Sequence, residues 1–173
     1  MIATWGFQGA QELINIHPIF VHFPIAFLLG AAAFYLLGSI FRRESLLAAG
    51  KWSLFAGALT AMITVWTGLQ AEDTVAHDEE VHQIMMKHQT LGIIVLIMSM
   101  LLSFWVAVSK ANIPTKRRGL FFAALFLLGM IILQQADFGG RMVFLKGVGV
   151  GRKSMMTEMV HHHDEHHEHH HSE

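Results

Sequence analysis

The sequence predicts an all-α fold: an integral membrane four-helix bundle with both termini on the outer side of the membrane. Hydrophobic residues make up 53% of the 173 residues and charged residues only 14%, against about 25% charged residues in soluble domains. Four apolar segments are each close to the ~20 residues that a helix needs to cross the hydrocarbon core. None of them contains Asp, Glu or Arg: 18–41, 48–69, 91–109 and 119–136. Continuous apolar runs of this length exclude the alternating strands of a β-barrel.

Two parts are expected along the chain. Residues 1–151 form the transmembrane domain, with helices at about 18–41, 48–69, 84–109 and 119–138, and residues 152–173 form a His-rich, low-complexity tail. The stretch before the first helix has no basic region and no small-residue cleavage site, so we expect no removable signal peptide. Pro18 is expected to begin the first helix, because proline lacks only an N–H group that would be unpaired there. Pro24 frees the carbonyl of Phe20 and permits a kink.

Glycines mark the expected end of the fourth helix. Gly139 and Gly140 are expected to end it, because glycine adopts the positive φ of a helix C-cap, and Asp137 is expected to cap it. The segment 141–151 alternates weakly in hydropathy. We therefore expect it to lie extended over the outer membrane surface.

Basic residues predict the orientation in the membrane. Seven of the twelve lie in the first and third connections: Arg42, Arg43, Lys51, Lys110, Lys116, Arg117 and Arg118. The positive-inside rule puts these connections on the cytoplasmic side of a bacterial inner membrane, and both termini and the second connection outside. The thirteen histidines then all lie on the outer side.

Two histidines, His22 in the first helix and His88 in the third, stand at similar shallow depths. Each is followed four residues later by a small residue, Ala26 or Gly92, which lets a helix or a flat macrocycle approach closely. The iron of a b-type haem needs two neutral imidazoles on opposite faces, and a helical bundle can hold the porphyrin between them. We therefore predict His22 and His88 as the axial ligands of one haem b.

Other roles stay open for the polar residues near this end. His17 would cap the first helix and support the site, or pair with His82 to hold a second haem. The same histidines could bind a non-haem metal, or hydrogen-bond to carbonyls and interfacial water without ligating anything. Gln134 could hydrogen-bond a haem propionate, a quinone carbonyl or a ligand imidazole. Arg141 could pair with a propionate or with a lipid headgroup.

Several motifs together resemble a known family. They are HPIFVHFPIAFLLG at 17–30, Thr-Gly at 67–68, KHQTLG at 87–92 and GGRMVFLKGVGV at 139–150. Over residues 14–151 the chain resembles the bacterial membrane proteins grouped as domain of unknown function 2231. The resemblance implies a four-helix membrane domain, similar in layout to small cytochromes b and often found near respiratory and c-type cytochrome components, with motif histidines at His17, His22 and His88. The family often has a histidine where this chain has Lys146, so that position offers no imidazole ligand here.

The tail supplies a second candidate metal site. Residues 161–173 read HHHDEHHEHHHSE, and clustered imidazoles with carboxylates bind Zn²⁺, Cu²⁺ or Ni²⁺ with little selectivity. The candidate metal ligands are His22 and His88 in the helices, together with the eight histidines of the tail. These are His161, His162, His163, His166, His167, His169, His170 and His171. The alternative is a solvated segment that is too polar to build a core. The chain has no cysteine, which excludes c-type haem attachment and Cys-ligated iron–sulfur clusters.

These observations predict a membrane electron-transfer subunit that links quinol or a respiratory complex to an external redox partner such as a c-type cytochrome. Two alternatives remain: a metal-handling membrane protein that uses the outer histidines and the tail, and a non-catalytic scaffold subunit of a respiratory assembly. The chain shows no nucleophile–base pair, phosphate-binding loop or carboxylate dyad, so an electron-transfer subunit is favoured over a stand-alone enzyme. We expect no nucleic-acid partner, although the net charge of −1 is by itself uninformative on this point.

Overall fold

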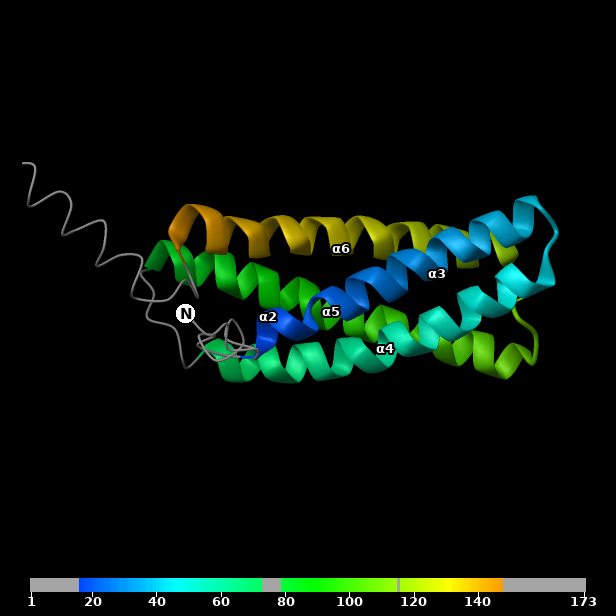
Figure 1. Ribbon diagram of the computed structural model, residues 1–173, viewed down its shortest axis with the longest axis horizontal. Helices are drawn as coiled ribbons and strands as arrows, with labels where there is room; N and C mark the ends of the chain where they lie inside the picture. Colours follow the sequence, from blue (N-terminus) through cyan, green and yellow to red (C-terminus); the bar gives the residue numbers. More distant parts are fainter. Residues whose placement is uncertain (1–15, 73–78, 115, 148–173) are drawn as a thin grey trace, which may run out of the picture.

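Four long helices form an antiparallel bundle in the computed structural model, which describes residues 16–72, 79–114 and 116–147 (Figure 1). The first of them is interrupted, so the elements are α2 (His17–Phe20), α3 (His22–Ile40), α4 (Glu44–Glu72), α5 (Glu79–Ser109) and α6 (Arg118–Lys146). The described residues contain no strand. The predicted all-α, four-helix fold is therefore confirmed.

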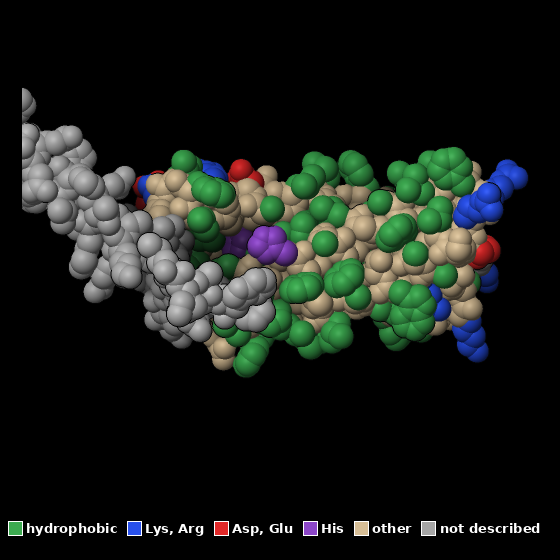
Figure 2. All heavy atoms as spheres, viewed as in Figure 1, with side chains coloured by type: hydrophobic (Ala, Val, Ile, Leu, Met, Phe, Trp, Pro, Cys, Tyr) green, Lys and Arg blue, Asp and Glu red, His purple; other side chains and the backbone are tan. Residues whose placement is uncertain are grey.

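All four helices are long and apolar enough to cross a membrane. With α2 and α3 counted as one span, the spans have 24, 29, 31 and 29 residues. At ~1.5 Å per residue, a helix of this size reaches ~44 Å, which exceeds the ~30 Å hydrocarbon core. Large apolar side chains cover the outside of the bundle (Figure 2), among them Trp52, Phe104 and Phe126. Helices that are apolar all round are typical of membrane spans, and the chain is a multi-pass membrane protein.

The two ends of the bundle differ in chemistry. At one end, which we call the basic end, α3 connects to α4 and α5 to α6, and cationic side chains such as Arg42 and Arg118 gather there (Figure 2). At the other end, the histidine end, α2 and α5 begin and α4 and α6 finish. All the described histidines belong to the halves of α2, α3 and α5 nearest this end. The imidazoles are thus confined to one side of the bundle.

The core of the basic half is tightly packed. Tyr35 is fully buried, and its ring meets that of Phe121 edge-on with 5.1 Å between the ring centroids. Glycines on α4 let α3 approach closely: a Cβ atom at Gly50 would lie 3.0 Å from the Tyr35 ring, and one at Gly57 would lie 2.5 Å from Leu28. Small residues at helix crossings allow this close approach in membrane bundles. The α3–α4 hairpin is therefore held by shape as well as by apolar area.

The end of α6 differs from the prediction. The helix continues through the glycine pair at 139–140 to Lys146, so 141–146 is helical and not extended. Asp137 is exposed inside the helix and does not cap it. The C-cap is Gly147, which adopts the left-handed conformation at φ 64°. A helix ends where that conformation is adopted, and Gly139 instead lies where a side chain of another helix packs closely.

Candidate functional site

The histidine end places two imidazoles at the edge of the hydrocarbon core. Counted from the basic end, His88 lies 21 residues before Ser109, and Thr64 lies 20 residues after Glu44. About 20 residues span the hydrocarbon core. His88 and Thr64 therefore lie near the boundary between hydrocarbon and headgroups, where an imidazole can reach a ligand or a partner without being placed at mid-membrane.

The break between α2 and α3 falls at Val21 and has a local cause. Pro24 has no N–H group, so the carbonyl of Phe20 has no partner inside its own helix. The hydroxyl of Thr64 on α4 donates to this carbonyl at 3.1 Å. The helix is interrupted only at Val21, which keeps the helical angles φ −58° and ψ −30°, and the short helix α2 packs beside α4 (Figure 1).

His17 extends from α2 to the end of α4. Its Nδ1 atom lies 3.1 Å from the carbonyl oxygen of Thr64 and 3.3 Å from the hydroxyl of Thr67. Its ring packs on Gly68, where a Cβ atom would lie only 3.0 Å from the ring. Any side chain at position 68 would push the imidazole away, so the glycine is part of the binding position.

His88 makes the equivalent contact between α5 and α6. Its Nδ1 atom donates to the carbonyl oxygen of Gln135 at 2.9 Å. Its ring packs on Gly139, where a Cβ atom would lie 3.2 Å from the imidazole Cε1. This contact explains the glycine inside α6, because the His88 imidazole occupies the space that a side chain at position 139 would fill.

The two imidazoles occupy equivalent positions in two successive helical hairpins. In both, 47 residues separate the histidine from the carbonyl that its Nδ1 contacts, Thr64 in one and Gln135 in the other. In both, a glycine follows that carbonyl residue by four positions, Gly68 and Gly139. We call each combination a carbonyl–glycine pair. The hairpin of α2, α3 and α4 and the hairpin of α5 and α6 thus present the same imidazole-binding arrangement twice.

The two rings meet inside the histidine end. The ring centroids of His17 and His88 are 6.4 Å apart, and the ring planes are at 89°. A carbonyl oxygen only accepts hydrogen bonds, so the Nδ1 atom of each neutral ring carries the hydrogen and the lone pair lies on Nε2. Backbone carbonyls orient metal-binding histidines in this way.

A small cavity lies beside His88 and is lined by residues of α3, α4, α5 and α6. Its volume is about 50 Å³, and its walls include Pro24, Thr64 and Gln135. Gly92 allows Gln135 to lie there, because a Cβ atom at that position would come within 2.7 Å of the amide nitrogen. Gln135 thus offers a carbonyl to His88 and a polar side chain beside the cavity.

Of the sequence-predicted ligands, His88 lies beside His17 and not beside His22. His22 is exposed on α3, and its Nδ1 atom donates to the carbonyl oxygen of Pro18 at 3.0 Å. Matching His22 and His88 by depth and by the small residue that follows each missed His17 as the neighbour of His88. The equal spacing of the two carbonyl–glycine pairs was the signal in the sequence that could have identified it. Which imidazoles bind a cofactor stays a prediction.

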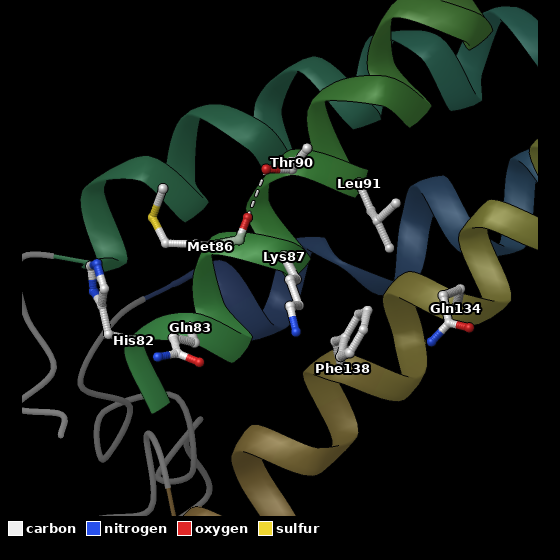
Figure 3. A pocket seen from close by; sticks show the side chains of 8 residues that line it. All are labelled: His82, Gln83, Met86, Lys87, Thr90, Leu91, Gln134 and Phe138. Carbon is white, nitrogen blue, oxygen red and sulfur yellow. Dashed lines mark hydrogen bonds between the residues drawn. The ribbon is translucent and has the colours of Figure 1, made fainter. Parts of the chain in front are cut away.

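The other predicted residues lie around this pair. His82 and Gln134 line an open groove between α5 and α6, on the outside of the bundle (Figure 3). Arg141 is exposed on α6 near the same end. Lys146 occupies the position where the family often has a histidine. Its ammonium group forms an ion pair with Glu80 at 2.6 Å.

A conventional metal site is absent from the part of the chain that the structure describes, where no three His, Asp or Glu side chains are grouped to hold an ion. The tail histidines, and the metal site predicted there, lie outside the described residues. Two imidazoles alone do not complete the tetrahedral shell of zinc. They are sufficient for haem iron, which takes its other four nitrogens from the porphyrin.

Comparison with known proteins gives one match. No curated protein and no solved structure matches the chain. A family model described as "Predicted membrane protein (DUF2231)" matches residues 13–152, which include all four spans, both imidazoles and both carbonyl–glycine pairs. The family expected from the sequence motifs is thus confirmed, and the chain belongs to the DUF2231 family of membrane proteins.

Proposed function

We propose that this chain is a membrane electron-transfer subunit that binds one b-type haem at the histidine end of the bundle. The observation that supports it is the pair of equivalent imidazoles, His17 and His88, each oriented through Nδ1 by a backbone carbonyl of the neighbouring helix. Two equivalent hairpins deliver one imidazole each to a shared centre. Six-coordinate haem iron requires one such ligand on each face.

The spacing of the two rings fits this ligand set. Two imidazoles bound on opposite sides of one metal ion, at ~2.0 Å per metal–nitrogen bond, have ring centroids ~6 Å apart. The centroids of His17 and His88 are 6.4 Å apart. The cavity of about 50 Å³ beside His88 is smaller than the ~300–1,000 Å³ of cofactor sites. Haem binding therefore requires the helices around the pair to move apart so that the porphyrin can enter between the rings.

Each residue of the proposed site has a distinct role. His17 and His88 would hold the iron through Nε2, and the carbonyls of Thr64 and Gln135 would fix ring orientation and tautomer. Arg141, exposed on α6 at the same end, would pair with a haem propionate. The bound haem would supply one-electron chemistry, and the polypeptide would supply the ligands and their orientation.

The charge distribution indicates which side of the membrane the proposed site faces. The positive-inside rule assigns the basic end to the cytoplasm, so the histidine end would face the extracytoplasmic side of a bacterial inner membrane. There the haem would pass electrons between a membrane quinol or a respiratory complex and an external partner such as a c-type cytochrome.

An optical spectrum of the detergent-purified protein, oxidised and then reduced, tests the proposal. We expect a reduced b-type α-band that is lost in His17→Gly and in His88→Gly, and restored in both by added imidazole. Rescue separates loss of a ligand from loss of the fold. The His22→Ala variant is expected to keep the band, because His22 lies exposed and away from the pair.

Two outcomes would reject this assignment. If protein produced with ample haem shows no porphyrin absorption, the chain is not a cytochrome subunit, and metal analysis with and without the tail becomes the next measurement. If His22→Ala loses the band and His17→Gly keeps it, haem is bound, but by the pair that the sequence first indicated.

A further inference from the structure

An open groove runs between α5 and α6 at the histidine end, on the side of these helices that faces away from the imidazole pair (Figure 3). Its volume is about 620 Å³, within the ~300–1,000 Å³ of sites that bind small molecules and cofactors. It is lined by His82, Gln83, Met86, Lys87, Thr90, Leu91, Gln134 and Phe138. Because α5 and α6 are membrane spans, the groove opens toward lipid.

Polar groups lie at both ends of the groove and apolar groups between them. His82 and Gln83 lie near the start of α5, and Gln134 lies on α6 at the level farther from the membrane surface, with Phe138 on the wall between (Figure 3). The Lys87 side chain extends from α5 toward α6 (Figure 3). A ligand that fills this groove must therefore offer hydrogen-bond acceptors at two separated places and an apolar body.

Lys87 brings a positive charge to this surface. The ion pair found in the described part of the chain joins Lys146 to Glu80 and does not involve Lys87. A cation at the membrane boundary is stabilised by snorkelling to the headgroups or by an acceptor. A ligand in the groove would meet the ammonium group of Lys87 on one side of Phe138 and the amide of Gln134 on the other (Figure 3).

Two polar residues of the groove, Lys87 and Gln134, have apolar counterparts in the first hairpin. The two hairpins are related by an offset of 71 residues, which carries His17 onto His88 and Gly68 onto Gly139. At the same offset, Lys87 corresponds to Ile16 and Gln134 corresponds to Ile63. The first hairpin therefore folds with apolar residues where the second has a cation and an amide, so these polar groups need an explanation other than folding.

The groove and the imidazole pair share one wall. Residues adjacent in the chain face opposite sides of it: Lys87 lines the groove and His88 the inner cavity, as do Gln134 and Gln135. An α-helix with its side chains is ~10–12 Å across. A molecule in the groove would therefore lie about one helix thickness from the proposed haem position.

We propose that this groove binds the head group of a lipid-soluble quinone. The quinone ring carries carbonyl oxygens on opposite sides and an apolar body, so one oxygen can accept from Gln134 and the other from Lys87 or Gln83 while the ring packs on Phe138 (Figure 3). The isoprenoid tail leaves through the open side into lipid. A phospholipid fits less well, because its acyl chains would lie against the end of the groove farther from the membrane surface, where Gln134 offers an amide. The inference rests on the proposed function for the claim that the bound quinone exchanges electrons with a haem. Quinone binding itself needs no haem.

Quinone binding can be measured directly on the full chain in phosphatidylcholine nanodiscs, with decylubiquinone and menaquinone-4 titrated by calorimetry. We expect Lys87→Met and Gln134→Leu each to weaken binding of at least one probe by about tenfold, as loss of one hydrogen bond from a charged or buried donor predicts. Matched controls are Lys146→Met and Gln89→Leu, since Lys146 pairs with Glu80 and Gln89 donates to Glu72 on α4. Both are expected to bind within about twofold of the unchanged protein.

The outcomes separate this inference from the proposed function. The inference is overturned if neither quinone binds, if all four variants bind equally, or if phosphatidylglycerol in the nanodiscs abolishes binding, which would make the groove a lipid site. Quinone binding that depends on Lys87 and Gln134 in a protein without a haem α-band would support the groove and reject the cytochrome assignment. A haem spectrum without groove-dependent binding would do the reverse.

Discussion

Replacing Gly139 by alanine tests the position of His88 without removing any polar group. Alanine in place of a helical glycine stabilises a protein by about 0.5–1 kcal/mol where there is space for the methyl group. At Gly140 the new Cβ would meet nothing closer than Phe144 at 3.9 Å. At Gly139 it would lie 3.2 Å from Cε1 of His88, inside the usual ~3.5–4.0 Å carbon contact. Alanine substitutions at these two adjacent positions are therefore expected to change the stability of the protein in opposite directions.

The expected change in unfolding free energy follows from the contacts that the His88 ring loses when it moves. Moving the ring away from position 139 lengthens its 2.9 Å hydrogen bond to the Gln135 carbonyl, and losing that bond costs about 1 kcal/mol. Overpacking adds about 1–3 kcal/mol. Against a gain of about 1 kcal/mol from helix propensity, we expect Gly139→Ala to be less stable than the unchanged protein by about 1–3 kcal/mol. Gly140→Ala should be more stable by up to about 1 kcal/mol.

The assay is reversible unfolding in mild detergent, followed by circular dichroism, on both variants side by side. The imidazole resonances of the two proteins provide an independent readout, since only Gly139→Ala should shift those of His88. Equal stabilisation by both substitutions would refute the reasoning, because it would mean that the His88 ring does not occupy the space above Gly139. The same experiment on the first hairpin is Gly68→Ala, where the new Cβ would lie 3.0 Å from the His17 ring.

Three further predictions use the same unfolding measurement. Thr64→Val should destabilise the protein by about 1–2 kcal/mol, because the Phe20 carbonyl loses the hydroxyl that donates to it. The control is Thr60→Val, which should change stability by less than half as much, because the Thr60 hydroxyl bonds only within α4. Gly57→Ala should destabilise by about 1–3 kcal/mol, since its Cβ would lie 2.5 Å from Leu28, and equal stability would show that α3 and α4 are farther apart. Tyr35→Phe should be neutral or stabilising by up to about 1 kcal/mol, because the buried Tyr35 hydroxyl has no hydrogen-bond partner among the described residues, and a clear loss of stability would reveal a partner for it.

The fold was predictable because one physical signal dominates it. Apolar runs of ~20 residues leave the backbone no alternative to a helix in lipid, and the spans found agree with the segments expected. The end of α6 was harder, because glycine has two uses that a single sequence does not separate. Gly147 is needed for its left-handed φ, whereas Gly139 is needed for the absence of a side chain next to His88.

The site was predictable only in part. His88 was identified as a candidate, but its partner was taken to be His22, because both stand at a shallow depth and are followed four residues later by a small residue. The structure instead brings His17 beside His88, and the contacts of His17 with Thr64 and Thr67 span 47 and 50 residues of sequence. Contacts of this kind are tertiary, so periodicity within one helix does not reveal them. A comparison of spacings between helices would have done so.

The repeated carbonyl–glycine arrangement also bears on where electrons could travel in the proposed cytochrome. Both pairs lie at the histidine end, and the described basic half carries no histidine and is filled by side chains such as Tyr35 and Phe121. A single chain would therefore hold one redox centre at one face and could not conduct electrons across the membrane by itself. The polar groove lies on the second hairpin, so an electron donor in it would approach the shared centre from the α5–α6 side. The α3–α4 side of that centre would then remain available for contact with another membrane subunit.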